Sequence, residues 1–233
     1  MRGLAAVARA ENIAIAASER LWTPARRSCS CCGWQGLSFR TLAVAGYLRH
    51  GVVCPRCGSF ERHRALAGFY PQYFAQRGMR PIRLVHCAPE PFLRPLLSSL
   101  CERYETNGYG ESYDADHQFD LRRIPLPDAS CDAFVMNHVL DCMDDDEAAA
   151  REMWRVLRPG GVVLATVTFD PGIDTTPERR DNGLRRIYGG HDVARRFASF
   201  DVQMLNAAEW VSDQRRAGVP ADVPVLVLRK AGS

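Results

Sequence analysis

The chain has 233 residues, of which 46% are hydrophobic and 24% charged, so it can bury a core and suits one ordinary domain with a small addition. Its net charge of +3 neither demands nor excludes a nucleic-acid partner, and no run approaches the length of a membrane span. Arg9, Glu11 and Asn12 interrupt the first apolar residues, so we expect no signal peptide and a cytoplasmic protein. Nine cysteines, four of them in paired CxxC spacing, favour a reduced compartment and a metal site over a disulfide framework.

Residues 1–28 are predicted to form a leader with one helix. Its alanine-rich part, residues 4–22, would end before Pro24. One side of this helix would carry Ile13, Ala16, Ala17 and Leu21. We expect the helix to pack on the main domain or to mediate contact in a homodimer, and a flexible lid over a cleft is the alternative.

Residues 29–64 contain two CxxCG sequences, which begin at Cys29 and at Cys54. Each places two sulfur atoms around a tight turn, and the glycine lets backbone amides turn toward the thiolates. Two such turns close a tetrahedral four-sulfur site that suits Zn²⁺. The expected ligands are Cys29, Cys32, Cys54 and Cys57, with Cys31 as the spare thiol. Four cysteines leave no open coordination position, so we expect structural zinc; an iron–sulfur cluster is the alternative.

A helix is predicted directly after the second CxxCG sequence, with Ser59 as its cap. Its apolar face would consist of Leu66, Phe69, Tyr70, Tyr73 and Phe74. Pro71 lies inside it and should kink or split it. Arg62, His63 and Arg64 would form either an anion site for the substrate or struts that tie the zinc module to the main domain. We favour struts for His63 and leave both readings open for the arginines.

Two buried strands joined by a helix are predicted within residues 132–169. The apolar face of the helix would consist of Ala150, Met153, Trp154 and Leu157. Acidic residues 144–147 at its start oppose the helix dipole, and Pro159-Gly160-Gly161 would end it. Such a βαβ unit needs a parallel sheet, which binds ligands at the carboxyl ends of its strands. Three polar residues would therefore border a cleft: Asn137, His138 and Asp141.

The block Asp128-Ala-Ser-Cys-Asp-Ala-Phe-Val-Met-Asn-His-Val-Leu-Asp, followed by Arg155-Val-Leu-Arg-Pro-Gly-Gly, resembles the centre of class I S-adenosylmethionine (SAM)-dependent methyltransferases. Together with Cys54-Pro-Arg-Cys-Gly-Ser-Phe-Glu-Arg-His-Arg, it is similar to a bacterial subgroup with an N-terminal zinc-knuckle module. The resemblance covers nearly all of the chain after residue 28. It implies an α/β fold in residues 65–233, with a Rossmann-like, mostly parallel sheet and an antiparallel edge hairpin, and SAM as cofactor.

The resemblance also implies a cofactor site at the first strand, residues 82–87, and the turn after it. That turn is glycine-rich in most of the class, but no glycine is present here. Three residues would line the cofactor: His86, Ala88 and Pro89. Glu90 would meet the α-amino group of SAM, and its alternative is a plain helix-start acid. Gly108 stands where the family usually carries the acid that binds the ribose, so a substitute would come from Asn107, Glu111 or Asp114.

The next loop, Phe119-Asp-Leu-Arg-Arg-Ile-Pro-Leu-Pro127, restores the family's motif. By resemblance, Asp120 would hold the adenine amino group and Leu121 would pack near the base, with Asn137 at the neighbouring strand end. His138 would be the catalytic base where the acceptor requires one, oriented by Asp141. A buried, hydrogen-bonded histidine is the alternative for His138.

The C-terminal part is predicted to form the substrate side. Residues 170–183 are polar and rich in turn formers, and we interpret them as a segment that covers the substrate. Tyr188 and His191 are candidate substrate contacts, with a turn tyrosine and a helix-start histidine as equal alternatives. Residues 200–205 and 223–229 should form the antiparallel hairpin, whose edge position Pro220 and Pro224 suit.

Three functions agree with the sequence. The first is methyl transfer from SAM to a small-molecule acceptor, of the secondary-metabolite or glycan kind, with zinc in a structural role. The second keeps the fold but replaces methylation by a cyclisation or rearrangement, which the missing ribose acid would fit. The third is a zinc-containing protein that binds or modifies nucleic acid; the small net charge and the few clustered aromatic residues argue against it.

Overall fold

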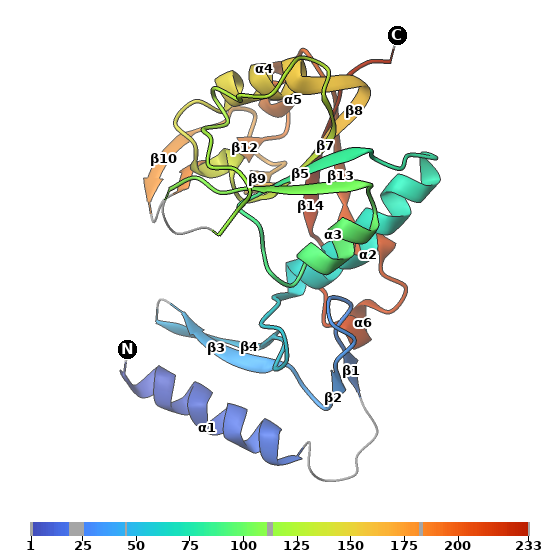
Figure 1. The fold of residues 1–233 in the computed structure, drawn as a ribbon. Coiled ribbons are helices and arrows are strands. Elements are labelled where there is room, and N and C mark those ends of the chain that lie inside the picture. Colours follow the sequence, from blue (N-terminus) through green and yellow to red (C-terminus); the bar gives the residue numbers. More distant parts are fainter. Residues whose placement is uncertain (1, 19–25, 45, 111–113, 182–183, 233) are drawn as a thin grey trace. The chain divides into compact units, whose positions relative to one another are not determined.

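The computed structural model describes residues 2–18, 26–44, 46–110, 114–181 and 184–232 (Figure 1). The chain forms two compact units. The knuckle unit comprises residues 1–77 and 207–223, and the sheet unit comprises residues 78–206 and 224–233. This division differs from the predicted boundary after residue 64, because the helix that follows the second CxxCG sequence and a segment near the C-terminus both pack with the knuckles.

The knuckle unit contains helix α1 (Arg2–Ser18) and helix α2 (Glu61–Gln76). Its strands form two antiparallel pairs, β1 (Arg27–Ser28) with β2 (Gln35–Gly36), and β3 (Arg40–Val44) with β4 (Tyr47–Val53). Residues 207–223 add the 3₁₀ helix η2 (Ala207–Trp210) and helix α6 (Gln214–Ala217).

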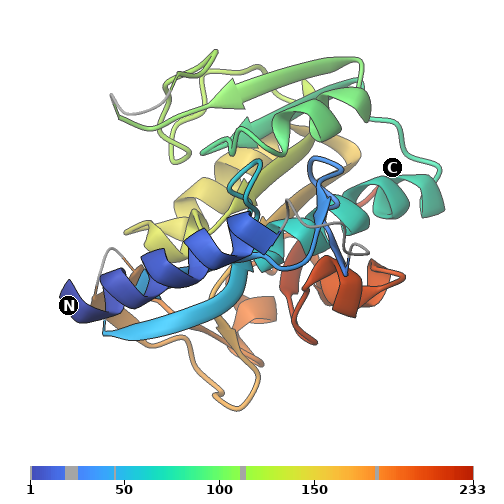
Figure 2. The same ribbon diagram turned by 90° about the horizontal axis from the view of Figure 1, so that it is seen from below.

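Helix α1 runs beside β3 within the knuckle unit (Figure 2). The side-chain amide of Asn12 donates to Thr41 O at 3.0 Å and accepts from Thr41 N at 2.8 Å, so it occupies backbone groups of an edge strand. Ala8 lies four positions before Asn12, on the same side of the helix, and is buried. Ile13 lies on another side and is 62% exposed. The predicted face was therefore misplaced around the helix, and Leu21 lies outside the described residues.

Helix α2 has the predicted apolar face, since Leu66, Phe69, Tyr70, Tyr73 and Phe74 are all buried. The ring of Phe69 lies 5.1 Å from that of Trp210 in η2. The helix continues through Pro71, so the predicted split does not occur. Its cap is Phe60 rather than Ser59, and His63 Nδ1 accepts a hydrogen bond from Phe60 N at 3.1 Å.

The sheet unit holds a six-stranded sheet in the order β13–β14–β8–β7–β5–β6. Four strands are parallel: β5 (Arg83–Cys87), β6 (Arg103–Asn107), β7 (Cys131–Asn137) and β8 (Leu157–Thr166). Strand β14 (Pro224–Arg229) runs antiparallel to β8 and to the edge strand β13 (Asp201–Asn206). This confirms the predicted α/β sheet with its antiparallel hairpin, although Pro224 opens an inner strand and Pro220 lies in the knuckle unit.

Figure 1 shows helices α4 (Asp146–Val156) and α5 (Asp192–Arg196) on one face of this sheet, and α3 (Arg94–Ser99) on the other. On the first face, Phe134 and Met136 of β7 share a buried core with Met153 of α4. The remaining elements are the 3₁₀ helix η1 (Leu140–Cys142), the parallel pair β9 (Phe169–Asp170) and β12 (Tyr188–Gly189), and the antiparallel pair β10 (Glu178–Asp181) and β11 (Leu184–Arg186). No helix in the described part of the chain is long and apolar enough to cross a membrane.

The junction between α4 and β8 corrects one prediction. The helix ends at Val156, and the Pro159-Gly160-Gly161 segment lies in β8, beside a bulge in its pairing with β7. A Cβ on Gly161 would meet Asp132 O at 3.1 Å, so the close strand approach needs glycine. Trp154, predicted to be buried, is 40% exposed, and Lys230 Nζ lies 4.0 Å from the centre of its ring.

Candidate functional site

A pocket of about 490 Å³ opens in the sheet unit at the carboxyl ends of β5, β6 and β7. Open α/β sheets bind ligands at this edge, and the volume lies in the range of small-molecule sites. The lining includes five predicted site residues: Ala88, Asn107, Asp120, Leu121 and His138. The other lining residues are Cys87, Tyr109, Phe119, Arg122, Val139, Cys142, Met143, Asp144 and Arg185.

The turn after β5 brings backbone to the pocket wall. Ala88 has φ +50°, a left-handed conformation that is uncommon without glycine, and its N–H donates to Asn107 O at 2.8 Å. His86 is fully buried and does not line the pocket. It lies between Tyr104 Oη and Glu90 Oε2, each 2.8 Å from a ring nitrogen, so it positions Glu90 from behind. Pro89 and Glu90, both predicted cofactor contacts, are also absent from the lining.

Gly108 follows β6 at the position where the family usually carries its ribose-binding acid, and no acid among the described residues 103–110 and 114–118 lines the pocket. Asn107 is buried, and its amide donates to Phe119 O at 3.1 Å and accepts from Phe119 N at 3.0 Å. This side chain therefore joins β6 to the next loop. Asp114 is exposed and is not a lining residue, and Glu111 lies outside the described residues. Tyr109, 69% exposed, lines the pocket here.

Asp120 faces the pocket as the resemblance implied. Its two carboxylate oxygens each lie 3.0 Å from Arg122 Nε, and Oδ2 also accepts from Arg122 Nη2 at 2.6 Å. The hydrogen bonds from Arg122 lower the pKa of Asp120, although burial acts in the opposite direction. The acid is therefore ionised and able to accept a further hydrogen bond from a ligand.

His138 and Asp141 meet as predicted. His138 has φ +51° and lies directly after β7, with 40% of its side chain exposed, and its Nδ1 lies 3.0 Å from Asp141 Oδ2. Asp141 is fully buried and also accepts from Thr168 N and Oγ1, both at 2.9 Å. Burial raises the pKa of Asp141, but His138 and Thr168 together hold that pKa below its ordinary value. Asn137 is buried and bonded to Thr166 Oγ1 at 3.1 Å, outside the pocket lining.

Because a carboxylate only accepts hydrogen bonds, Nδ1 of His138 must donate to Asp141. In the neutral imidazole, Nε2 is then the free acceptor. The pair thus provides a proton acceptor beside the pocket.

Tyr188 is completely buried, in contrast to the predicted substrate contact. Its hydroxyl donates to Asp146 Oδ2 at 2.6 Å. Arg196 also binds Asp146, with Nε at 2.8 Å and Nη2 at 2.6 Å, and Arg186 Nη1 lies 2.8 Å from it. Burial is the main cause that raises the pKa of Tyr188, followed by the neighbouring Asp146 charge. His191 is exposed and does not line the pocket, and its Nε2 lies 3.7 Å from Asp174 Oδ1.

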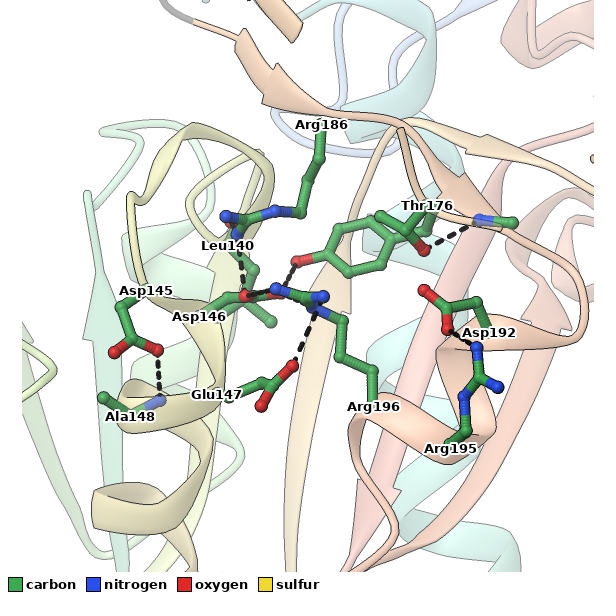
Figure 3. Close-up of polar contacts among 12 residues, drawn as sticks. Leu140, Asp145, Asp146, Glu147, Ala148, Thr176, Arg186, Asp192, Arg195 and Arg196 are labelled. Atoms are coloured by element: carbon green, nitrogen blue, oxygen red, sulfur yellow. Dashed lines mark hydrogen bonds and ion pairs between the residues drawn. The ribbon is translucent and has the colours of Figure 1, made fainter. Parts of the chain in front are cut away.

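This cluster around Asp146 fixes one wall of the pocket. Arg186, itself buried, donates to Leu140 O at 3.3 Å (Figure 3). It also donates to Asp144 O at 2.9 Å. The neighbouring Arg185 lines the pocket and pairs with Asp144 at 3.1 Å. Sequence reasoning missed both arginines as well as Arg122; the only available signal was their position beside predicted site residues.

A cysteine cluster lies in the knuckle unit. The sulfur atoms of Cys29, Cys32, Cys54 and Cys57 all lie within 4.8 Å of one another. The Cys29–Cys57 and Cys32–Cys54 sulfur distances are 3.8 and 3.7 Å. Tetrahedral zinc with bonds of about 2.3 Å needs sulfur atoms about 3.8 Å apart, so the four cysteines fit this metal.

The two knuckle turns have the predicted geometry. Gly33 and Gly58 have φ +71° and +77°, and their N–H groups donate to the carbonyls of Cys29 and Cys54. Ser59, rather than capping α2, is buried with its hydroxyl 3.3 Å from Cys29 Sγ and 3.2 Å from Cys57 Sγ.

Comparisons with known proteins give the same class as the fold. Residues 67–165 match the sequence family described as a methyltransferase domain. A probable S-adenosylmethionine-dependent methyltransferase of Mycolicibacterium smegmatis is 45% identical over 117 residues, which cover 48% of this chain and 38% of that protein. The ubiquinone/menaquinone biosynthesis C-methyltransferase UbiE of Caulobacter vibrioides is 50% identical over 98 residues, 42% of this chain and 32% of that protein.

The crystal structure of the [4+2]-cyclase SpnF has a similar fold, with a TM-score of 0.50 and 19% identity over 72% of this chain and 82% of that chain. The sheet order and the matched segment show a Rossmann-like methyltransferase fold with a mostly parallel sheet. Residues 67–165 carry the family match. The match to each of the two curated relatives spans less than two fifths of that relative's length.

Proposed function

We propose that the protein transfers the methyl group of SAM to a small-molecule acceptor. The observation that carries this proposal is the pocket at the strand ends of a methyltransferase sheet, lined by Ala88, Asp120 and His138. Its volume of about 490 Å³ lies in the range of small-molecule and cofactor sites.

The residues around the pocket fit the cofactor. Asp120 would accept the adenine amino group, with Leu121 against the base, while the Ala88 turn would lie along the methionine part. Glu90, held by the buried His86, would take the α-amino group at the rear of the turn. SAM supplies an already activated sulfonium methyl group, so the protein has to align donor and acceptor and exclude water.

His138 would serve as the base for an acceptor that must lose a proton. Its Nε2 would accept the acceptor's O–H or N–H proton as the methyl bond forms. Asp141 would hold the ring through Nδ1 and stabilise the resulting imidazolium. Because Thr168 fixes the carboxylate with two hydrogen bonds, the ring orientation is set before the ligand binds.

The second candidate is a rearrangement or cyclisation in the same pocket without methyl transfer. The observation that favours it is the end of β6, where Asn107 is hydrogen-bonded to the backbone of Phe119 and no acid among the described residues 103–110 and 114–118 lines the pocket. Weak SAM binding would follow from this arrangement.

Calorimetric titration with S-adenosylhomocysteine tests the first proposal. We expect saturable binding to the metal-loaded protein, weakened in Asp120→Ala, which loses the adenine contact. Arg195→Ala, an exposed change in α5 outside the pocket, is the matched control and should bind as the wild type does. Absence of binding to the folded wild type would exclude SAM-dependent methyl transfer. Labelled SAM with candidate acceptors then separates transfer from rearrangement.

We also propose that the four clustered cysteines hold one structural zinc ion. Four thiolates would fill its coordination sphere, so it would supply no catalytic position. Metal analysis of purified protein should give one zinc per chain, lost in Cys32→Ser together with Cys54→Ser.

A further inference from the structure

Arg64 is a fully buried cation at the start of α2. Its guanidinium donates to four carbonyl oxygens, those of Val52, Ser59, Ala217 and Gly218, at 2.6 to 3.0 Å. It also lies 3.7 Å from the ring centre of Phe39. Among the described residues, no carboxylate forms an ion pair with it. A buried charge of this kind is costly unless another charge compensates it.

The cysteine cluster provides the missing charge. Arg64 Nη1 donates to Ser59 O at 3.0 Å, while the hydroxyl of the same serine contacts Cys29 Sγ and Cys57 Sγ. Ser30 Oγ also donates to Arg64 O at 2.6 Å, which ties the first knuckle to the same helical turn. Zinc with four thiolates has a formal net charge of about −2. Ser59 therefore contacts both the guanidinium and the proposed centre of opposite charge.

Arg64 also reaches a part of the chain that is far away in sequence. Its bonds to Ala217 O, at 2.6 Å, and to Gly218 O, at 3.0 Å, span 153 and 154 residues. Gly218 has φ +59°, and a Cβ there would come within 2.7 Å of the Phe39 ring and 3.3 Å of Arg64 Nη2. The end of α6 is thus shaped to fit the guanidinium and the ring on which it stacks.

We infer that Arg64 is the buried counter-charge of the zinc centre and that it couples metal binding to the packing of residues 214–218. The inference rests on the proposed zinc site. With zinc bound, the guanidinium faces a compensating negative charge, and the carbonyls of Ala217 and Gly218 complete its hydrogen bonds. Coupling between two equilibria is reciprocal. If bound zinc raises the equilibrium constant for packing of residues 214–218 by some factor, that packing raises the affinity for zinc by the same factor.

Zinc affinity measured by competition with a chromophoric chelator tests the inference. Arg64→Met should weaken zinc binding about 10- to 100-fold, as loss of groups around metal ligands commonly does. Arg64→Lys keeps the charge but not the four-carbonyl geometry, so it should retain more of the affinity. Arg56→Met removes an exposed cation that contacts Cys32 O at 3.3 Å, and solvent screening should leave its affinity unchanged.

Gly218→Ala makes the inference testable even where Arg64→Met does not fold. This change adds neither charge nor ligand, yet it displaces Phe39 and Arg64, so it should also weaken zinc binding. Hydrogen exchange of residues 214–218 should accelerate in zinc-loaded Arg64→Met. Equal zinc affinities for wild type, Arg64→Met and Gly218→Ala would overturn the inference. Wild-type protein that binds no zinc would instead refute the proposed metal site.

Discussion

His138 adopts a left-handed backbone conformation at the end of β7, which few non-glycine residues do. Its N–H donates to Thr166 O at 2.9 Å, and its ring is bonded to the buried Asp141. Both interactions keep the residue in this conformation and direct the imidazole toward the pocket. The strain is consistent with a selected orientation, since such conformations concentrate at functional sites.

Asp141 should make stability depend on acid pH. Its folded pKa is lowered, so its contribution is fully present above the unfolded pKa of about 3.9 and is lost as pH falls through the lower folded value. Urea unfolding from about pH 6 to about pH 3 should show wild type more stable than Asp141→Asn, with a gap that shrinks below about pH 4.

Asp144→Asn is the control for this measurement, because that side chain is 71% exposed and pairs only with Arg185 among the ion pairs of the described residues. Its difference from wild type should be small at every pH. A gap for Asp141→Asn that stays constant with pH would contradict the assigned role of the carboxylate.

At the residue scale, chemistry carried by one short motif was predictable from the sequence. His138 and Asp141 are three positions apart, and their contact is as expected. Partners that fold brings from elsewhere were not predictable. The side chain of Asn107 is hydrogen-bonded to the backbone of Phe119, and the Tyr188 hydroxyl is hydrogen-bonded to Asp146, which is 42 positions away. These polar side chains were therefore assigned to ligand binding from the sequence, whereas in the structure they form hydrogen bonds within the protein.

The start of α4 shows how neighbouring acids differ once an element is packed. Asp145 caps the helix and accepts from Ala148 N at 2.8 Å, in a solvent-exposed position. Asp146 is fully buried between Arg186 and Arg196 (Figure 3). It also accepts a hydrogen bond from the Tyr188 hydroxyl. From the sequence, both acids read equally as helix-dipole partners.

These two acids should respond differently to truncation. Asp145→Ala should lower the free energy of unfolding by about 1 kcal/mol, the usual cost of a lost cap. Asp146→Ala leaves the buried Arg186 and the half-buried Arg196 without their shared carboxylate and should cost about 3–5 kcal/mol. Denaturant unfolding at neutral pH compares them, with each variant acting as the control for the other. If both variants lost the same free energy of unfolding, the buried cluster around Asp146 would stabilise the fold no more than the Asp145 cap does.

Element types followed from sequence periodicity better than element ends did. The apolar face of α2 is as expected, because it has long side chains at helical spacing. The predicted end of α4 was wrong, because Leu157 already pairs with Cys131 of β7 and the strand absorbs the two glycines in a bulge. Strand pairing, which involves a distant segment, overrode the local helix signal.

At the scale of the whole molecule, the two units should respond differently to removal of zinc. A chelator should accelerate hydrogen exchange in β1, the two knuckles and α6, because the proposed metal holds these short elements together. Exchange in β7 and β8 of the sheet unit should remain unchanged. Added zinc should restore protection, whereas added magnesium, which prefers oxygen ligands, should not. Protection of the knuckles that does not depend on metal would contradict the proposed structural role.

The order of synthesis has a consequence for the buried Arg64. The knuckles leave the ribosome first, but two of the four carbonyls that bind this arginine belong to Ala217 and Gly218. These residues lie on the connection between β13 and β14, so five of the six sheet strands precede them. Synthesis of the knuckle unit therefore begins before that of the sheet unit and is completed only after five of the six sheet strands. A truncated chain that stops before residue 217 would carry every proposed zinc ligand, yet it would lack half of the acceptors for a buried charge.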